Sequence, residues 1–250
     1  MLPHEYNFNP TYFKMQLFYH PDASENEAFI TLSKEESNHI IKVIRKQEGD
    51  VIYITNGKGF LFTTEISLAS STKCQVKIMH FLKQKPLNYK LHLAVAPTKM
   101  NERFEWFLEK ATEIGIHEIT PIICNQSERR SVKTERFYKI IESAMKQSLH
   151  YYMPILNQPI SFAEFITKKH IGQKFIAHCD DESEKKSLKH EIEKSAPVTL
   201  MIGPEGDFSE TEITEAILNN FVAVSLGHTR LRTETAAVVA CHSVAFINEL

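Results

Sequence analysis

The sequence lacks several features that define whole classes of protein. It has no run approaching about 18 consecutive apolar residues, which excludes a transmembrane helix. The N-terminal segment MLPHEYNFNP lacks the charged and apolar regions of a signal peptide. The four cysteines lie 50 or more residues apart, so they form no zinc-type or redox motif. These absences together predict a cytoplasmic protein that does not enter a membrane.

The remaining composition is that of a folded protein with an uneven charge. Apolar residues make up 42% of the 250 residues, and 16 phenylalanines exclude a disordered chain. The formal net charge of −2 is a weak argument against a nucleic-acid partner. Residues 83–150, however, carry 12 basic and 8 acidic groups, a net charge of +4. A polyanion would dock there, although a solvated helical face of mixed charge has the same composition.

The first eighty residues have the pattern of a small β-barrel. Apolar runs are short and closely spaced, and Asn56-Gly57 is a hairpin signal between two of them. The polar segment 83–88 is the expected linker to a second domain. Strands are expected at residues 15–20, 28–32, 51–55, 59–69 and 73–82.

A short helix interrupts these strands. Ser33 and Glu36 have the spacing of a capping box at its start. Ile40, Val43 and Ile44 then share one face, which we expect to be buried.

From residue 90 onward, strands alternate with helices, which favours a mostly parallel sheet. One helix is expected to begin with Asn101 as its cap and to stop at Gly115. A second covers 134–149, and a third follows a capping box of Ser209 and Glu212. Strands are expected at residues 91–97, 118–124, 174–179, 198–203 and 221–226.

Two further features concern packing. The last segment, 233–247, is apolar on nearly all sides, so we expect it to be buried, in part against another subunit. Trp106, the one tryptophan, has apolar neighbours on its helix. We therefore expect Trp106 to pack inside the protein rather than to stack on a base.

The most informative motif is Gly203-Pro204-Glu205-Gly206, which joins an apolar strand to a capped helix. Ligands of open α/β sheets bind at the carboxyl ends of strands, where glycine allows close backbone approach. The exposed amides of the following helix favour polar or anionic ligands. A plain strand–helix turn would show the same residues. Neither GxGxxG nor GxxxxGK[ST] occurs, which argues against nicotinamide enzymes and P-loop NTPases.

A second motif comes directly after the last strand. Gly227 precedes Arg230 and Arg232, whose planar guanidinium groups suit a phosphate or a base edge. Thr233 has the alternative role of capping the final helix.

A third strand end carries His178, Cys179, Asp180 and Asp181, and it would lie nearby if the strands are neighbours. This cluster resembles a metal site, but the sequence has no second ligand pair at a usable spacing. We therefore expect no metal.

Five segments in register resemble a known family. MIGPEGDFSETEI and SLGHTRLRTETAA resemble the C-terminal signatures of the bacterial 16S ribosomal RNA uracil-N3 methyltransferases, of the SPOUT superfamily. NERFEWFLEKATEIGIHEITPI, the stretch from SERRSVKTERF to AMKQSLHYYMPIL, and HIIKVIRKQEGDVI are similar to its upstream signatures. The resemblance runs from about residue 15 to residue 247.

This resemblance implies a fold and a reaction. The fold would be a PUA-like β-barrel domain over 15–84, followed by an α/β SPOUT methyltransferase domain over 89–250 with a C-terminal trefoil knot. The cofactor would be S-adenosylmethionine, and the protein would act as a homodimer. The substrate would be N3 of a uridine in the decoding region of 16S rRNA, within the assembled 30S subunit.

The resemblance also assigns residues. Arg232 is the first candidate for stabilising the uracil anion that forms when N3 loses its proton, and Arg129 is the second. Glu205 is a less favoured general base. The cofactor-binding candidates are His178, Ile202, Gly203, Glu205, Gly206, Leu226, Gly227, Leu231, Thr233 and Thr235. The RNA-binding candidates are His39, Arg45, Arg129, Arg130, Lys133, His150 and Arg230, within a basic field that also includes Arg136, Lys139 and Lys146.

The chain departs from the family pattern at a few positions. Asp207 stands where the family commonly has a second glycine, and His150 stands where an arginine is usual. Thr229 and Arg230 replace a basic–aliphatic pair. We expect residues 1–14 to be an extension ahead of the usual start, with Met15 as the native initiator.

Two other functions remain open at this point. One is a SPOUT methyltransferase that acts on transfer RNA, because the knot loops are shared. The other is a non-catalytic RNA-binding protein of ribosome assembly that retains the fold.

Overall fold

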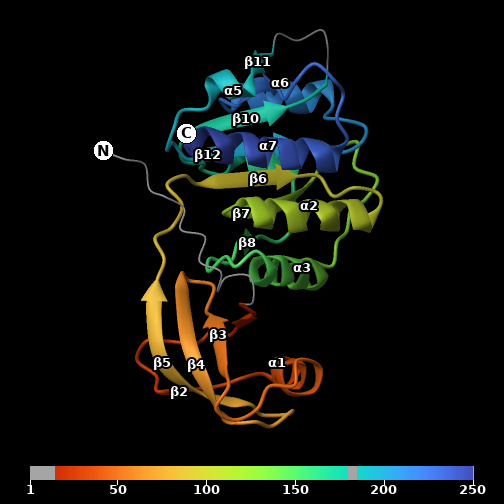
Figure 1. The fold of residues 1–250 in the computed structure, drawn as a ribbon. Helices are drawn as coiled ribbons and strands as arrows, with labels where there is room; N and C mark the ends of the chain where they lie inside the picture. The colour runs from red at the N-terminus through yellow and green to blue at the C-terminus, as the bar shows by residue number, and fades with distance from the viewer. Residues whose placement is uncertain (1–14, 180–184, 250) are drawn as a thin grey trace, which may run out of the picture. The chain divides into compact units, whose positions relative to one another are not determined.

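The structure is a computed structural model that describes residues 15–179 and 185–249 (Figure 1). The expected N-terminal extension, Asp180 and Asp181 lie outside the described residues. The chain divides into two compact units. One contains the residues up to Pro86 together with Met145–Tyr152, and the other contains Leu87–Ala144 together with the residues from Met153 onward.

The first unit is built on a mixed sheet with the strand order β1-β3-β4-β5-β2, which forms a half-barrel. The pair β1–β3 is parallel, and the other pairs are antiparallel. Alternate residues such as Ile52, Ile54 and Phe62 face a buried core. The strands are β1 (Leu17–Tyr19), β2 (Phe29–Thr31), β3 (Val51–Thr55), β4 (Phe60–Leu68) and β5 (Gln75–Lys83).

The predicted helix of this unit forms but changes its winding. Ser33 caps α1 (Lys34–Asn38) by accepting a hydrogen bond from the backbone N–H of Glu36. The chain then continues as a π-helical turn over His39–Val43. This wider turn keeps Ile40 buried but rotates Val43 into solvent, where it is 65% exposed. The expectation that Val43 lies on the buried face was therefore wrong.

The second unit contains a sheet with the order β11-β13-β10-β12-β6-β7-β8, and β9 pairs with β7. All of these pairs are parallel. The five strands predicted here all form, as β6 (Leu91–Val95), β7 (Glu118–Ile123), β10 (Gln173–Ala177), β12 (Val198–Ile202) and β13 (Val222–Ser225). Three short strands were not predicted: β8 (Ile155–Leu156), β9 (Ile160–Ser161) and β11 (Lys186–Ser187).

Helices cover both faces of this sheet (Figure 1). Side chains from α2, α3, α5 and α7 pack on one face, and side chains from α4 and α6 pack on the other. Alternate residues of β12 supply both cores: Leu200 faces the first and Met201 faces the second. The helices are α2 (Asn101–Ile114), α3 (Thr134–Gln147), α4 (Phe162–Thr167), α5 (Leu188–Glu191), α6 (Glu210–Leu218) and α7 (Thr233–Glu249).

The start of α2 differs from the prediction by one residue. Met100 is the N-cap, in an extended conformation, and Asn101 is already helical. The Thr98 hydroxyl donates to the Met100 carbonyl at 2.7 Å in this turn. Because Asn101 is already the first helical residue, its side chain does not cap the helix. At the other end, Gly115 adopts a left-handed conformation with φ of 111° and stops α2 as predicted.

Of the two packing predictions, the one for Trp106 was wrong, and the one for the last helix holds for one of its faces. Trp106 is 43% exposed, because its neighbours Phe104 and Phe107 occupy the buried stripe of α2 and Trp106 points away from it. One face of α7 is buried in the core, as Ala240 and Val244 show. Phe246 on α7, however, is 52% exposed in the single chain. No helix of the described residues is long and apolar enough to cross a membrane.

Candidate functional site

Two adjoining cavities, of about 370 and 260 Å³, lie at the carboxyl ends of β10, β12 and β13. The strand order explains their position, because β10 pairs with β12 on one side and with β13 on the other. The three loops after these strands therefore meet at one edge of the sheet, as expected if the strands are neighbours. Both cavities are lined by Ala177, Cys179, Arg230, Leu231 and Ala236.

The larger cavity is formed by the Gly-Pro-Glu-Gly turn after β12. Ile202, Gly203 and Glu205 line it. A side chain on Gly203 would lie 3.1 Å from the ring of Phe208, so the turn has no spare room there. Glu205 Oε1 accepts a hydrogen bond from the backbone N–H of Lys99 at 2.9 Å. Glu205 therefore fixes the loop after β6, which favours the pocket-shaping role over that of a general base.

Asp207 connects two of the three loops. Its backbone has φ of 66°, a conformation that glycine adopts most easily. Its Oδ2 accepts from the backbone N–H of Cys179 at 2.6 Å, and its Oδ1 accepts from the N–H of Phe208 at 2.8 Å. The residue that departs from the family pattern thus joins the loop after β12 to the loop after β10.

The smaller cavity is formed by the loops after β10 and β13. His178 lines it and is 6% exposed, and Leu226 and Gly227 line the opposite part. Gly227 has φ of 154°, and an added side chain there would meet no atom within 4 Å. The Ser225 hydroxyl donates to the Gly227 carbonyl at 2.8 Å and holds this turn.

The start of α7 closes the site from the third side. The buried Thr233 lines the larger cavity, and its hydroxyl donates to the Gly203 carbonyl at 3.0 Å. This bond ties α7 to the turn after β12, so Thr233 does more than begin a helix. Gly206 and Thr235 are absent from the described lining of both cavities. Gly206 instead allows the turn to approach Gln126, whose Cβ would lie 3.0 Å from an added side chain.

Sequence reasoning missed Glu234, the residue after Thr233. It is 7% exposed, its Oε1 lies 3.8 Å from Nε of Arg103, and its buried Oε2 has no partner among the described residues. The sequence did contain a signal for Glu234: the motif Arg232-Thr233-Glu234-Thr235 has a carboxylate at the start of an otherwise apolar helix.

The two candidate catalytic arginines differ in position. Arg232 is exposed and lines the larger cavity, and Arg230 lines both cavities. Arg129 lines neither cavity within the described chain. Its guanidinium donates to the carbonyls of Ser131 and Lys99, at 3.2 and 3.4 Å. Lys99 in turn contacts Glu205, which lines the larger cavity. Arg129 is therefore connected to the cavity through Lys99 and does not line it.

Part of the predicted basic field is neutralised by partners. Arg136 forms two contacts with Glu105, of 2.6 and 2.8 Å, and Lys146 pairs with Glu36 at 2.7 Å. Lys133 is exposed. Arg130 is also exposed, and its guanidinium donates to the Asn125 carbonyl at 3.3 Å.

Three RNA-binding candidates belong to the first unit. His39 lies on the π-helical turn with its ring against Phe18, 6.0 Å between centroids. Arg45 is exposed and has a left-handed backbone, and His150 is half-buried in the segment after α3. These three side chains are thus carried by a different unit from the one that contains the two cavities.

The structure does not test the whole metal-like cluster, because part of it lies outside the described part of the chain. No group of three metal-binding side chains occurs among those residues, and Asp180 and Asp181 lie outside them. Burial raises the pKa of the Cys241 thiol to about 12, and it also raises that of Cys124, so neither is a ready thiolate ligand.

The chain is similar to known proteins over most of its length. Residues 84–245 match the RNA methyltransferase domain family, and residues 32–79 match the RNA methyltransferase PUA domain. The chain is 26% identical over 239 residues to "Ribosomal RNA small subunit methyltransferase E" of Bacillus subtilis, covering 90% of this chain and 93% of that protein.

Two solved structures are similar over nearly the whole chain. A "probable rRNA-methyltransferase" from Porphyromonas gingivalis is 38% identical with a TM-score of 0.86, covering 94% of this chain and 99% of that one. "Ribosomal RNA small subunit methyltransferase E" from Neisseria gonorrhoeae, bound to S-adenosyl methionine, is 27% identical with a TM-score of 0.78. That match covers 91% of this chain and 95% of the other. The chain thus has a three-loop site at the carboxyl edge of a parallel sheet, together with a PUA-like unit. Because the model of the RNA methyltransferase domain matches more than half of the chain, the protein belongs to the RNA methyltransferase family.

Proposed function

We propose that this methyltransferase uses S-adenosylmethionine to methylate N3 of a uridine in the decoding region of 16S rRNA, within the assembled 30S subunit in the cytoplasm. The observation that carries the proposal is the pair of adjoining cavities formed by three strand-end loops. Small-subunit rRNA methylation is the activity named for the B. subtilis relative, which aligns with 90% of this chain.

The residues around these cavities fit the cofactor. S-adenosylmethionine is a nucleoside with an amino-acid tail and supplies a methyl group on a sulfonium. Gly203 and Gly227 allow close backbone approach on two sides, and Leu226 and Leu231 offer apolar surface to an adenine ring. The other proposed cofactor-binding residues are His178, Ile202, Glu205, Gly206, Thr233 and Thr235.

Arg232 is the proposed catalytic residue. When N3 of uracil loses its proton and gains the methyl group, negative charge spreads to the flanking carbonyl oxygens in the transition state. The Arg232 guanidinium, exposed at the larger cavity, can stabilise that charge. Arg129 takes a positioning role, because its guanidinium contacts backbone carbonyls beside the cavity rather than the cavity itself.

The RNA would be held by residues of both units. Arg130, Lys133 and Arg230 are exposed in the second unit, and phosphate contacts from such side chains position RNA. The corresponding candidates of the first unit are His39, Arg45 and His150. We assign the PUA-like domain to 15–84 and the SPOUT domain to 89–250. We also propose the C-terminal trefoil knot that the family resemblance implies. Residues 226–232 lead from β13, on one side of β10, to Thr233, whose hydroxyl donates to the Gly203 carbonyl after β12 on the other side.

We also propose that the protein works as a homodimer. Helices α2 and α7 pack together, and each leaves a large apolar side chain exposed, Trp106 and Phe246. The buried Oε2 of Glu234 at the start of α7 is a further group that a second subunit could satisfy. These features support a second copy of the chain that packs against α2 and α7.

A methyl-transfer assay tests the proposal. Purified protein is incubated with radiolabelled S-adenosylmethionine and with 30S subunits, naked 16S rRNA or transfer RNA, and the modified nucleoside is identified by mass spectrometry. We expect 3-methyluridine in 16S rRNA, with 30S subunits as the better substrate. Label confined to transfer RNA would contradict the proposal, and measurable cofactor binding with no transfer would favour an assembly factor.

Arg232→Ala tests the assigned role. We expect the rate of transfer to fall about a hundredfold while cofactor affinity stays near that of the wild type. Arg136→Ala is the matched control, because that arginine is paired with Glu105 and is absent from the described lining of the cavities. Full methylation by Arg232→Ala would remove Arg232 from the mechanism.

A further inference from the structure

A third and larger cavity, of about 590 Å³, lies at the opposite edge of the same sheet. Its lining includes the first residues of three neighbouring strands: Leu91 of β6, Glu118 of β7 and Val198 of β12. The cofactor loops lie after the carboxyl ends of β10, β12 and β13, so the two sites lie at opposite ends of β12. Ligands of parallel sheets usually bind at the carboxyl edge, which makes a large cavity at the amino edge unusual.

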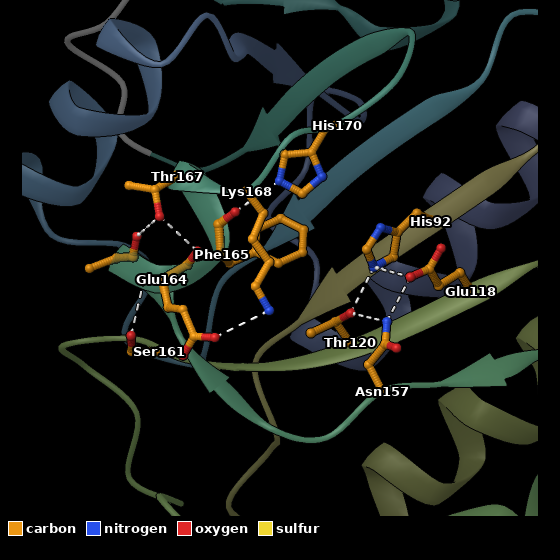
Figure 2. Close-up of polar contacts among 11 residues, drawn as sticks. His92, Glu118, Thr120, Asn157, Ser161, Glu164, Phe165, Thr167, Lys168 and His170 are labelled. Atoms are coloured by element: carbon orange, nitrogen blue, oxygen red, sulfur yellow. Dashed lines mark hydrogen bonds and ion pairs between the residues drawn. The ribbon is translucent and has the colours of Figure 1, made fainter.

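The floor of this cavity is a polar network from two strands and a loop (Figure 2). The Asn157 amide donates to Glu118 Oε1 at 2.7 Å and to Thr120 Oγ1 at 2.8 Å. Thr120 Oγ1 lies 2.7 Å from Nε2 of His92. No described residue bonds to the second carboxylate oxygen of Glu118, whose side chain is 35% exposed. The network thus holds a carboxylate in place and leaves one of its oxygens to accept hydrogen bonds from a ligand.

One wall of the cavity is aromatic. The ring of Phe165 lies 4.6 Å from that of His170 and 5.4 Å from that of His92, between centroids. The His170 ring is held by a contact of 2.8 Å between its Nε2 and the Phe165 carbonyl. Burial, reinforced by His170 and opposed by Glu118, lowers the pKa of His92 to about 4. His92 is therefore neutral at physiological pH and adds no charge to the wall.

The lining of this cavity also includes exposed cations. Lys90, Lys168 and Lys169 line the cavity and are exposed, whereas Glu118 is the one acidic residue of its described lining. Lys168 is already engaged, because its Nζ lies 3.2 Å from Glu164 Oε1 (Figure 2). Lys90 and Lys169 thus remain the main cations for an anionic group of a ligand.

We propose that this cavity binds a nucleotide, with N–H groups of the base donating to Glu118 and the phosphate contacting Lys90 and Lys169. A nucleotide has three properties that match the cavity. Its planar base suits the aromatic side chains, its N–H donors suit Glu118, and its phosphate suits the lysines. A volume of about 590 Å³ is typical of pockets for molecules of this size and is large for an amino acid. The nucleotide could be a free metabolite or one unit of an RNA strand, and the chemistry of recognition is the same.

Calorimetric titration with guanosine 5′-monophosphate is the test. Guanine has two adjacent N–H donors on one edge, either of which can donate to the carboxylate oxygen of Glu118 that Asn157 does not occupy, so this nucleotide is a suitable probe. The protein is first saturated with S-adenosylmethionine, so that a nucleotide cannot bind in the cofactor cavities. We expect binding of the nucleotide that is stronger than that of guanosine or of inorganic phosphate alone, because each of these lacks one half of the contacts.

Two sets of variants locate the binding. Glu118→Gln keeps an acceptor for Asn157 but removes the charge, and we expect it to weaken binding about tenfold or more. Glu113→Gln is its control, because the Glu113 side chain on α2 is 30% exposed and is absent from the cavity lining described. The double change Lys90→Ala with Lys169→Ala should lower the affinity for the nucleotide about fivefold and should leave the affinity for guanosine nearly unchanged. Lys189→Ala on α5 is the control for lost positive charge.

The outcomes are distinct. The affinity of each variant for S-adenosylmethionine reports whether its fold is intact. An RNA oligonucleotide that displaces the bound nucleotide would identify RNA as the source, whereas an oligonucleotide that does not compete would identify a free nucleotide. The proposal is overturned if the nucleotide does not bind to the cofactor-saturated protein, or if Glu118→Gln binds it as the wild type does. The proposal would also be overturned if the cavity bound the free amino acid glutamate and no nucleotide.

Discussion

Asp207 shows how one side chain can replace conformational freedom with hydrogen bonds. A glycine at this position would adopt the left-handed backbone without strain, but it would leave the N–H groups of Cys179 and Phe208 without their acceptor. The carboxylate satisfies both groups and connects two loops that line the cofactor cavities. The departure from the family pattern at this residue therefore preserves the turn and adds a cross-link.

We predict that Asp207→Gly weakens the binding of S-adenosylmethionine about tenfold, because hydrogen bonds to a charged acceptor are lost while the turn itself is kept. Calorimetry measures the change. Asp50→Gly is the control, since Asp50 also accepts from a backbone N–H, that of Gln47 at 2.8 Å, but belongs to the first unit. An unchanged affinity in Asp207→Gly would show that the cross-link does not order the site.

His92 gives a second prediction at this scale, concerning pH. Its pKa is about 4 in the folded protein against 6.5 for an ordinary histidine, so the unfolded chain takes up this proton first as the pH falls. The free energy of unfolding should decline between about pH 6.5 and pH 4, by at most about 3 kcal/mol, and this contribution should then level off.

Urea unfolding of His92→Gln at about pH 7 and about pH 5 checks this prediction, because the variant should lose less stability on acidification than the wild type. His190→Gln, at an exposed position on α5, should behave as the wild type does. Equal losses in all three proteins would mean that His92 does not titrate in this range.

At the scale of elements, the start of α6 is joined to the loop after β7 through one carboxylate. Glu212 is 4% exposed and completes the capping box by accepting from the N–H of Ser209 at 2.9 Å. It also accepts from the N–H of Asn125 at 2.8 Å. The carboxylate that caps the helix thus also fixes a neighbouring loop.

We predict that Glu212→Ala lowers the free energy of unfolding by about 2–4 kcal/mol, because buried donors lose their acceptor. Glu210→Ala changes an exposed glutamate in the same turn of the helix and should cost less than about 0.5 kcal/mol. Urea denaturation of the two variants provides the comparison. A similar, small cost for both would show that the Asn125 contact contributes nothing.

Local signals predicted the elements better than their mutual arrangement. The capping box at Ser209 and the stop at Gly115 depend on a few adjacent residues, and both form as predicted. The exposure of Val43 depends on a π-helical turn, for which the sequence carries no clear periodic signal. Trp106 was misjudged because an apolar neighbourhood in sequence does not say which face of the helix meets the core.

The candidate site shows the same division. The Gly-Pro-Glu-Gly turn and the Arg230–Arg232 segment were identified from sequence because they stand at strand ends. That they converge depends on β10 lying between β12 and β13, which only the tertiary structure gives. The amino-edge cavity was not predicted, because Glu118, Asn157 and Lys90 come from separate segments and form no motif.

At the scale of the whole molecule, the proposed dimer gives α2 and α7 the role of an interface between two subunits. Trp106 and Phe246 are exposed in the single chain, and Phe246 stacks with His242 at 5.8 Å between centroids. Burying such side chains is a large favourable contribution to association. Replacing Phe246 by a charged residue would therefore oppose the association of the two subunits.

We predict that Phe246→Glu shifts the protein from dimer to monomer in sedimentation equilibrium and lowers methyl transfer in parallel. Leu218→Glu is the matched control: Leu218 is 76% exposed on α6, and its replacement should leave the dimer intact. A wild-type protein that sediments as a monomer, or a Phe246→Glu variant that remains dimeric, would contradict the proposed interface.

The position of β6 has a consequence for the time course of synthesis. One edge of β6 pairs with β7, which is made within the next thirty residues or so, but the other edge pairs with β12, whose register joins Leu91 to Val198. At about 5–20 residues per second, a ribosome needs about 5–20 s to make the chain between these partners. Throughout that interval a largely apolar strand has an unpaired edge that is open to other chains. The nascent protein is therefore expected to depend on a chaperone until its last quarter emerges.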